Sequence, residues 1–146
     1  MNDPKVAVFF YGSYMNPRVL EEANRSPEPL TPATLEDFEI VIRPLANLVR
    51  SDRGHVYGAL AFATHAELER LYAHAREVLG GNYLPFPVVV RTRGGEHVPT
   101  FCYIAPALEP RPASNDYIDR IVQPAKLHGF PTSYVAHLES FRPTSG

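Results

Sequence analysis

A strand, a glycine turn and a helix start succeed one another between residues 6 and 17. Val6–Tyr11 is β-branched and aromatic and stops at Gly12, a pattern typical of a buried strand. Asn16-Pro17 then predicts a helix start, because Asn caps free amides and Pro suits the first helical turn. Such a turn points successive backbone N–H groups at one place, near the positive end of a helix dipole, which favours an anion such as a carboxylate or an oxyanion. An ordinary strand-to-helix turn is the alternative interpretation.

Periodicity and capping signals predict four further strands and three further helices. The strands cover residues 38–43, 56–63, 83–91 and 97–104. The helices begin near Thr64, Asn115 and Thr132. Thr64 and Glu67 have the spacing of a capping box, the second helix is expected to close at Gly129, and Thr132 can cap the last helix. Residues 26–32 predict a loop with three prolines, and residues 51–54 predict a turn. Pro124 is expected to interrupt the helix that begins near Asn115. Pro85 and Pro87 place the start of one hairpin strand at a sheet edge or a bulge.

Composition and charge exclude several classes of protein. The chain has 146 residues, and we expect one α+β domain over residues 1–146. With 16 acidic and 14 basic residues, it has no electrostatic reason to bind nucleic acid. No apolar run approaches the roughly 18 residues that a membrane helix needs, and the N-terminus predicts no signal peptide. The single cysteine, Cys102, cannot form an internal disulfide, which suits a reducing cytoplasm.

The common catalytic and cofactor motifs are missing from the sequence. The six histidines form no HExxH motif and no close pairing with cysteine, so no metal site is expected. There is no GxxxxGK or GxGxxG loop for a nucleotide, and no GxSxG motif surrounds a serine. Cys102 lies in a predicted strand, where a packed thiol is the expected role rather than a nucleophile.

Six short motifs are distributed over nearly the whole chain. They are Tyr11-Gly12-Ser13-Tyr14-Met15, Val56-Tyr57-Gly58, the helix with Leu68 and Leu71, Gly81-Asn82-Tyr83, Ser114-Asn115-Asp116-Tyr117 and Gly129-Phe130-Pro131-Thr132-Ser133-Tyr134. In this order they resemble the motifs of the γ-glutamylcyclotransferase-like (AIG2-like) family. The first resembles the YGS(N/L)(L/M) loop that opens that family's sequences. The six motifs together identify the family more specifically than any single motif does.

This resemblance implies a small mixed β-barrel flanked by helices, with a substrate cavity at the barrel mouth. It implies an intramolecular reaction in which the α-amine of a γ-glutamyl amine or peptide attacks its own γ-carbonyl, giving 5-oxoproline and a released amine. No cofactor is implied, because proximity within one substrate supplies an effective concentration of up to ~10⁵ M or more. The substrate-binding residues implied by the motifs are Tyr11, Gly12, Ser13, Tyr14, Met15, Tyr83 and Tyr117. For the last two, packing in the core or at the rim is the alternative role.

The family's proton-moving glutamate is displaced in this chain. In the family it follows the second leucine of an L-x-x-L helix by four positions, and counting from Leu71 leads to Ala75. Counting backward from Gly81-Asn82-Tyr83 places the family's glutamate position at Arg76 instead, so the two motifs place that position one residue apart. An alanine in this place cannot carry out acid–base chemistry. The sequence therefore indicates a length difference between the helix and the next strand.

Glu77 is the candidate catalytic residue in place of the family glutamate. In a regular helix it lies about 200° round from Ala75, toward solvent. It reaches the cavity if the helix unwinds before Gly80; otherwise it is a solvated surface charge, and His74 is a weaker substitute.

Three functions therefore remain open on the sequence alone. They are an enzyme, a non-catalytic relative that binds a small carboxylate ligand or a partner, and an interaction domain with a filled cavity. An open cavity with an inward Glu77 favours the enzyme, an open cavity without a carboxylate favours the binding protein, and a filled cavity favours the third. Arg43, Asn47 and Arg50 are further candidates for binding the substrate or the departing group, with a place on the rim as the alternative. The leaving group and the oligomeric state are not specified.

Overall fold

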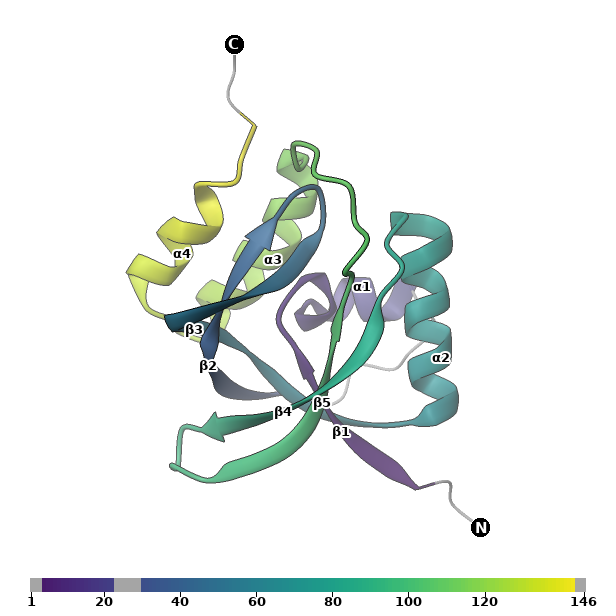
Figure 1. Ribbon diagram of the computed structural model, residues 1–146, viewed down its shortest axis with the longest axis vertical. Helices are drawn as coiled ribbons and strands as arrows, with labels where there is room; N and C mark the ends of the chain where they lie inside the picture. Colours follow the sequence, from purple (N-terminus) through teal and green to yellow (C-terminus); the bar gives the residue numbers. More distant parts are fainter. Residues whose placement is uncertain (1–3, 23–29, 144–146) are drawn as a thin grey trace.

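Five β-strands pair in a closed ring, and helices pack around it (Figure 1). The structure is a computed structural model that describes residues 4–22 and 30–143. The strands are β1 (Lys5–Phe10), β2 (Thr31–Ile42), β3 (Ala46–Thr64), β4 (Leu84–Thr92) and β5 (His97–Ile104), joined in the order β1-β3-β2-β4-β5. Four neighbouring pairs are antiparallel, while β1 runs parallel to β5 at Val8 and Phe101. The predicted α+β fold, a small mixed sheet flanked by helices, is confirmed.

The longest strand contradicts one predicted turn. Residues 51–54 belong to β3, which continues to Thr64 without reversing. The pairing of β2 with β3 shifts in register beside Asp37, whose φ is 69°. Several residues of β3 therefore lie opposite one residue of β2, and a bulge absorbs the polar, glycine-containing segment that resembles a turn.

The predicted proline loop before β2 is shorter than expected. Residues 26–29 of that loop lie outside the described residues, but Thr31 and Pro32 already belong to β2. Pro32 is tolerated because it stands at the beginning of the strand, where a missing N–H costs little.

The hairpin of β4 and β5 confirms its predicted form. The two strands pair along their whole length, from Leu84 with Ile104 to Arg91 with His97. β4 pairs with β2 at its far end, through Arg91 and Thr92. Pro85 and Pro87 therefore stand at the other end of β4, where proline's missing N–H is tolerated.

In the described residues, four α-helices flank the ring, with α2 on one side and α3 and α4 together on the opposite side (Figure 1). Their bounds are α1 (Pro17–Glu22), α2 (His65–His74), α3 (Asn115–Leu127) and α4 (Thr132–Glu139). The predicted capping box before α2 is confirmed, because the Thr64 hydroxyl accepts from the Glu67 amide at 3.1 Å and the Glu67 carboxylate accepts from the Thr64 amide at 2.9 Å.

Two helix predictions are wrong. α3 is not interrupted at Pro124 but runs through it to Leu127. Its end near Gly129 is confirmed, since Gly129 has a φ of 71°. Thr132 does not cap α4, because Pro131 occupies the N-cap position and makes no side-chain capping bond.

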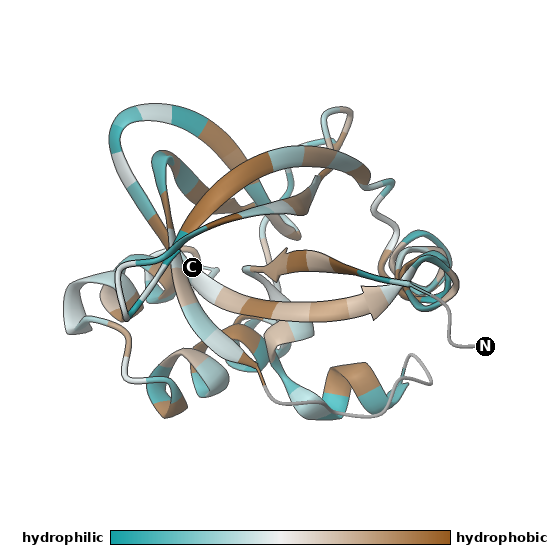
Figure 2. Ribbon diagram, turned by 90° about the horizontal axis from the view of Figure 1, so that it is seen from below, coloured by the Kyte–Doolittle hydropathy of each residue, from teal (hydrophilic) through white to brown (hydrophobic). Residues whose placement is uncertain are grey.

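The core lies inside the ring and beneath the helices. Phe9, Ile40, Ile42, Leu71 and Ile118 are among its large, fully buried side chains, and hydrophobic residues recur along the strands (Figure 2). In the part of the chain that the structure describes, no helix is long and apolar enough to cross a membrane.

Candidate active site

The turn after β1 approaches the start of β3 very closely. Gly12 leads into a short 3₁₀ turn, Ser13–Met15, before α1 begins at Pro17. A Cβ atom placed on Gly12 would lie 2.8 Å from the Cβ atom of Ala46. Glycine is therefore required here by the approach of another strand.

The backbone amides at the start of α1 already have acceptors within the protein. Asn16 caps this helix: its backbone carbonyl accepts from Val19 at 3.0 Å, and its side-chain oxygen accepts from the Arg18 amide at 3.0 Å. The amides of Met15 and Asn16 also donate within the turn, to Gly12 and Ser13. The backbone amides of residues 12–14 are therefore the remaining candidates for binding an anion at this turn.

A cavity lies against this turn. Its volume is about 30 Å³, room for about one or two water molecules, and it is partly open to solvent. Its lining residues come from segments far apart in the sequence: Phe9, Phe10, Tyr11, Gly12, Ser13, Tyr14, Ala46, Tyr72, Ala75, Leu79, Tyr83, Tyr103 and Tyr117. Six of the chain's eight tyrosines are among them. In this structure the lining side chains leave little free space in the cavity, and no carboxylate is among these described lining residues.

The tyrosine hydroxyl groups are tied to the backbone around the cavity. Tyr83 donates to the carbonyl of Ala46, and the Ala46 amide donates to the Tyr117 hydroxyl at 3.0 Å. Tyr11 donates to the carbonyl of Tyr103, whose ring stacks on Tyr72 with centroids 3.6 Å apart. These bonds fix the walls of the cavity before any ligand arrives.

Burial keeps these phenols neutral. It raises the pKa of Tyr11 and of Tyr72 well above the ordinary value of 10.0, and it also raises the pKa of Tyr83. Burial also raises the pKa of Tyr117, although hydrogen bonds from the Ala46 amide and from Ser13 partly oppose it. At neutral pH the walls therefore offer uncharged donors and apolar rings to a ligand.

Tyr14 differs from the other tyrosines in its partners. Its hydroxyl donates to the carbonyl of Leu71 and lies 3.1 Å from Nδ1 of His74, at the end of α2. It is thus linked to an imidazole.

A comparison with family models gives a match over residues 55–138, more than half of the chain, to the AIG2-like family. The chain belongs to the AIG2-like family. This result confirms the family resemblance of the sequence motifs.

Several solved structures have the same fold as this chain. A γ-glutamyl cyclotransferase is 24% identical, with a TM-score of 0.81 over 97% of this chain and 90% of the other. An uncharacterized protein from Homo sapiens is 23% identical, with a TM-score of 0.80 over 99% and 92%. A yeast γ-glutamyl cyclotransferase specific to glutathione is 14% identical, with a TM-score of 0.64 over 95% and 96%. These likenesses show the fold. No curated protein matches the chain in sequence.

The helix before β4 contains the length difference that the sequence indicates. After His74, α2 passes into a π-helical turn, Ala75–Leu79, and ends at Gly80 with a φ of 84°. The Gly80 amide donates to the carbonyl of Ala75, five residues earlier. A π turn holds one more residue than an α turn. It therefore accounts for the difference of one residue between counting forward from Leu71 and counting backward from Gly81-Asn82-Tyr83.

The structure does not bring Glu77 to the cavity. The helix widens instead of unwinding, and Glu77 is exposed and does not line the cavity. Ala75 is 1% exposed and does line it. The catalytic assignment of Glu77 therefore lacks the geometry that it requires.

The other predicted site residues divide into two groups. Tyr11, Gly12, Ser13, Tyr14, Tyr83 and Tyr117 meet around the cavity. Met15 lies beneath the turn in the core, 1% exposed, and does not line the cavity. Asn47 exchanges two hydrogen bonds with the backbone of Ala105, and Arg50 lies over the ring of Phe38. Arg43 and these two residues do not line the cavity.

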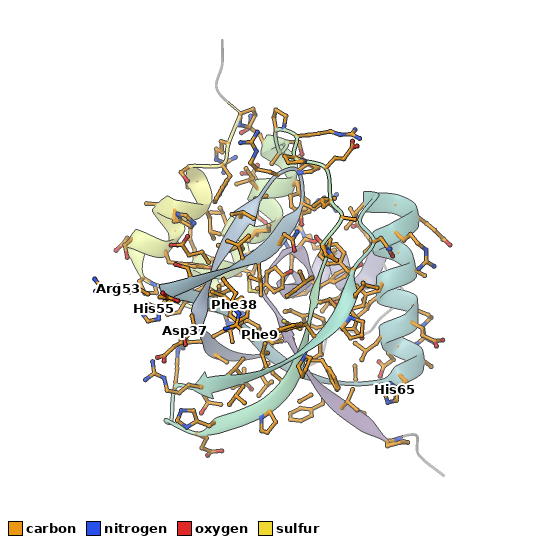
Figure 3. The ribbon with its side chains drawn as sticks, viewed as in Figure 1. Phe9, Asp37, Phe38, Arg53, His55 and His65 are labelled. Carbon is orange, nitrogen blue, oxygen red and sulfur yellow. The ribbon has the colours of Figure 1, made fainter. Side chains whose placement is uncertain are left out.

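The structure gives no support for metal or thiol chemistry. Within residues 4–22 and 30–143, no group of three or more His, Cys, Asp or Glu side chains is placed to hold a metal ion. His55 lies beside Arg53 across the molecule from His65, with Phe9 near the centre between them (Figure 3). Cys102 is fully buried in β5, as predicted, and burial raises its pKa to about 12, which makes it a poor nucleophile.

Sequence reasoning missed several lining residues. Tyr72 is on the helix that contains Leu68 and Leu71, and Tyr103 is near the end of β5. Ala46 begins β3, and Leu79 ends the π turn. One signal was available: tyrosines recur close to the ends of predicted strands and helices.

Proposed function

We propose that this protein is a cyclotransferase-type enzyme that converts a γ-glutamyl amine or peptide into 5-oxoproline and a free amine. The observation that carries the proposal is the Gly12–Tyr14 turn forming one wall of the tyrosine-lined cavity. The AIG2-like family and the fold shared with γ-glutamyl cyclotransferases support the same type of function. In the proposed reaction, the α-amine forms a C–N bond to the γ-carbonyl, and the original amide C–N bond then breaks.

The proposed roles follow from the chemistry of the cavity wall. The amides of residues 12–14 receive the substrate carboxylate or the oxyanion of the tetrahedral intermediate. Tyr83 and Tyr117 contribute neutral hydroxyls and, with Tyr11, hold the walls in place. The aromatic rings exclude water and hold the substrate folded, so that its own amine lies close to its own carbonyl. Met15 supports the turn from the core.

A direct assay tests this function. The purified protein is incubated with a panel of γ-glutamyl amines, amino acids and short peptides, and released 5-oxoproline is quantified by mass spectrometry. We expect release without added metal, nucleotide or flavin, and the same rate after chelation. Loss of activity on chelation, restored by a metal, would contradict the cofactor-free reaction. No release from any compound would contradict the enzyme.

A non-catalytic binding protein is the second candidate. The observation that favours it is the absence of a carboxylate among the described cavity residues. Calorimetric titration with 5-oxoproline and with glutamate separates the two functions. Binding of either ligand, without 5-oxoproline release from any γ-glutamyl compound, supports the binding protein.

A further inference from the structure

A cyclisation of this kind must move one proton from the attacking amine to the leaving amine. General acid–base catalysis usually relies on a side chain that exchanges protons near neutral pH. Ala75 lines the cavity where a carboxylate would serve, and Glu77 is outside it. Another group must carry the proton.

Tyr14 is a cavity residue whose hydroxyl contacts an imidazole. The hydroxyl lies 3.1 Å from Nδ1 of His74, and the two rings are 6.1 Å apart. By contrast, Tyr11 and Tyr83 donate to backbone carbonyls, which are not bases at neutral pH. The hydroxyl hydrogen of Tyr14 has two acceptors within reach, the Leu71 carbonyl and His74.

We propose that Tyr14 is the catalytic residue that moves the proton, and that His74 is a positioning residue that holds the proton Tyr14 gives up. This inference rests on the proposed cyclotransferase function. When the α-amine bonds to the γ-carbonyl, the carbonyl electron pair moves to oxygen and the amine proton passes to the Tyr14 oxygen. Tyr14 gives its own proton to Nδ1 of His74. The oxyanion electron pair then re-forms the carbonyl as the amide C–N bond breaks. The pair of that bond leaves on the departing nitrogen, which takes a proton from Tyr14 while His74 returns one to Tyr14.

Burial explains why the two residues must act together. It raises the pKa of Tyr14 above its ordinary value, so the phenol does not ionise on its own. A transfer in which the phenol gains one proton as it loses another avoids a buried phenolate. Imidazole is the side chain that ordinarily exchanges protons near neutral pH.

The position of His74 suits a temporary positive charge. It is in the last turn of α2, where the carbonyl end of a helix favours a cation. It is partly exposed, so it can equilibrate with solvent. Along its own helix, the exposed Arg70 and Glu77 stand one turn before and after it, and Tyr14 is the titratable side chain that contacts it in the described part of the chain.

The experiment compares the parent with Tyr14→Phe, His74→Asn and a control, His65→Asn. His65 begins the same helix at its far end and is exposed (Figure 3). We expect Tyr14→Phe to lower kcat by about 10²–10⁴-fold with KM changed less than about threefold. His74→Asn keeps a hydrogen-bonding group beside Tyr14 but cannot exchange a proton near neutral pH. We expect it to lower kcat by about tenfold or more, and His65→Asn to match the parent.

The pH profile distinguishes proton transfer from a structural role. In the parent, kcat should fall on the acidic side of its pH profile, because a protonated imidazole cannot accept a proton. His74→Asn should lose that fall, while His65→Asn should keep it. This comparison decides the matter even if Tyr14→Phe fails to fold, as judged by its circular dichroism.

Each outcome bears on the proposal. An active parent with kcat unchanged in His74→Asn, and with the same pH profile, overturns the Tyr14–His74 assignment and leaves the proposed function intact. A parent that releases no 5-oxoproline from any γ-glutamyl compound overturns both. Loss of kcat in both site variants, with loss of the acidic fall in His74→Asn, supports the proposal.

Discussion

The side-chain amide of Asn16 donates to the backbone carbonyl of Arg120 at 3.1 Å, and this bond explains how α3 runs through a proline. Pro124 has no N–H, so the carbonyl four residues earlier loses its helical donor. Asn16 supplies the missing donor from the turn after β1, while its side-chain oxygen caps α1. One buried side chain, 6% exposed, thus joins the turn at the cavity to α3.

We expect Asn16→Ala to lower the free energy of unfolding by about 1–3 kcal/mol, because it removes a helix cap and leaves a carbonyl without its donor. Urea denaturation followed by circular dichroism measures this. Pro124→Ala is the matched control, since it restores an N–H for the Arg120 carbonyl. In that background Asn16→Ala should cost less, as a double-mutant cycle reports. Equal costs in the two backgrounds would show that the bond contributes nothing.

The contact between Gly12 and Ala46 predicts a rescue. Gly12→Ala places a Cβ atom 2.8 Å from that of Ala46, and we expect it to cost about 1–3 kcal/mol of stability and to weaken ligand binding. Ala46→Gly removes the opposing atom, so the double variant should recover much of both losses. Thermal unfolding and calorimetry with 5-oxoproline measure them. If the double variant is no more stable and binds 5-oxoproline no more tightly than Gly12→Ala, the contact with Ala46 is not the cause of the losses.

The exposed position of Glu77 predicts a small effect on catalysis. Glu77→Gln keeps the size of the side chain and removes the carboxylate, outside the cavity. We expect kcat to change by less than about threefold, against the ~10²–10⁴-fold loss expected of a general base. The 5-oxoproline assay measures it. A loss in the larger range would restore Glu77 as the catalytic residue.

Ala75 offers a test by gain of function. Ala75→Glu places a carboxylate in the cavity, where burial raises a carboxyl pKa toward the range of a neutral-pH base. We expect faster 5-oxoproline release from Ala75→Glu than from Ala75→Gln, which has nearly the same volume. Equal rates in these two variants would mean that the carboxylate cannot reach the reacting amine.

Buried phenols and a buried thiol predict a loss of stability at alkaline pH. Burial raises the pKa of Tyr11 and of Tyr72 well above 10.0, and that of Cys102 from 9.0 to about 12. A group whose pKa is raised on folding contributes stability that is complete below its unfolded pKa and is lost as pH rises toward its folded pKa. The free energy of unfolding should therefore fall from about pH 9, and more steeply above about pH 10, by up to about 1.4 kcal/mol per pH unit for each group.

Urea denaturation between about pH 8 and pH 11 measures this profile. Cys102→Ala should remove the first part of the decline and keep the steeper second part. If the free energy of unfolding stays constant above about pH 10, the predicted loss of stability from the buried phenols is wrong.

Local signals predicted most elements because their causes are local. The capping box at Thr64 and the left-handed Gly80 each act within a few residues of themselves. The places where prediction failed depend on distant partners. Residues 51–54 stay in β3 because β2 pairs on either side of the bulge, and Pro124 stays in α3 because Asn16 supplies a donor.

The sequence by itself determined the order of strands, turns and helices and the family motifs, since these depend on residue type and short spacing. It also determined that Ala75 stands near the family's glutamate position. Only the tertiary structure decided that six tyrosines meet around one cavity, because packing between distant segments leaves no periodic signal in the chain. It likewise decided that Glu77 faces solvent, because the π turn sets the direction of that side chain. It also decided that Tyr14 reaches His74, because this contact joins residues 60 positions apart in the chain.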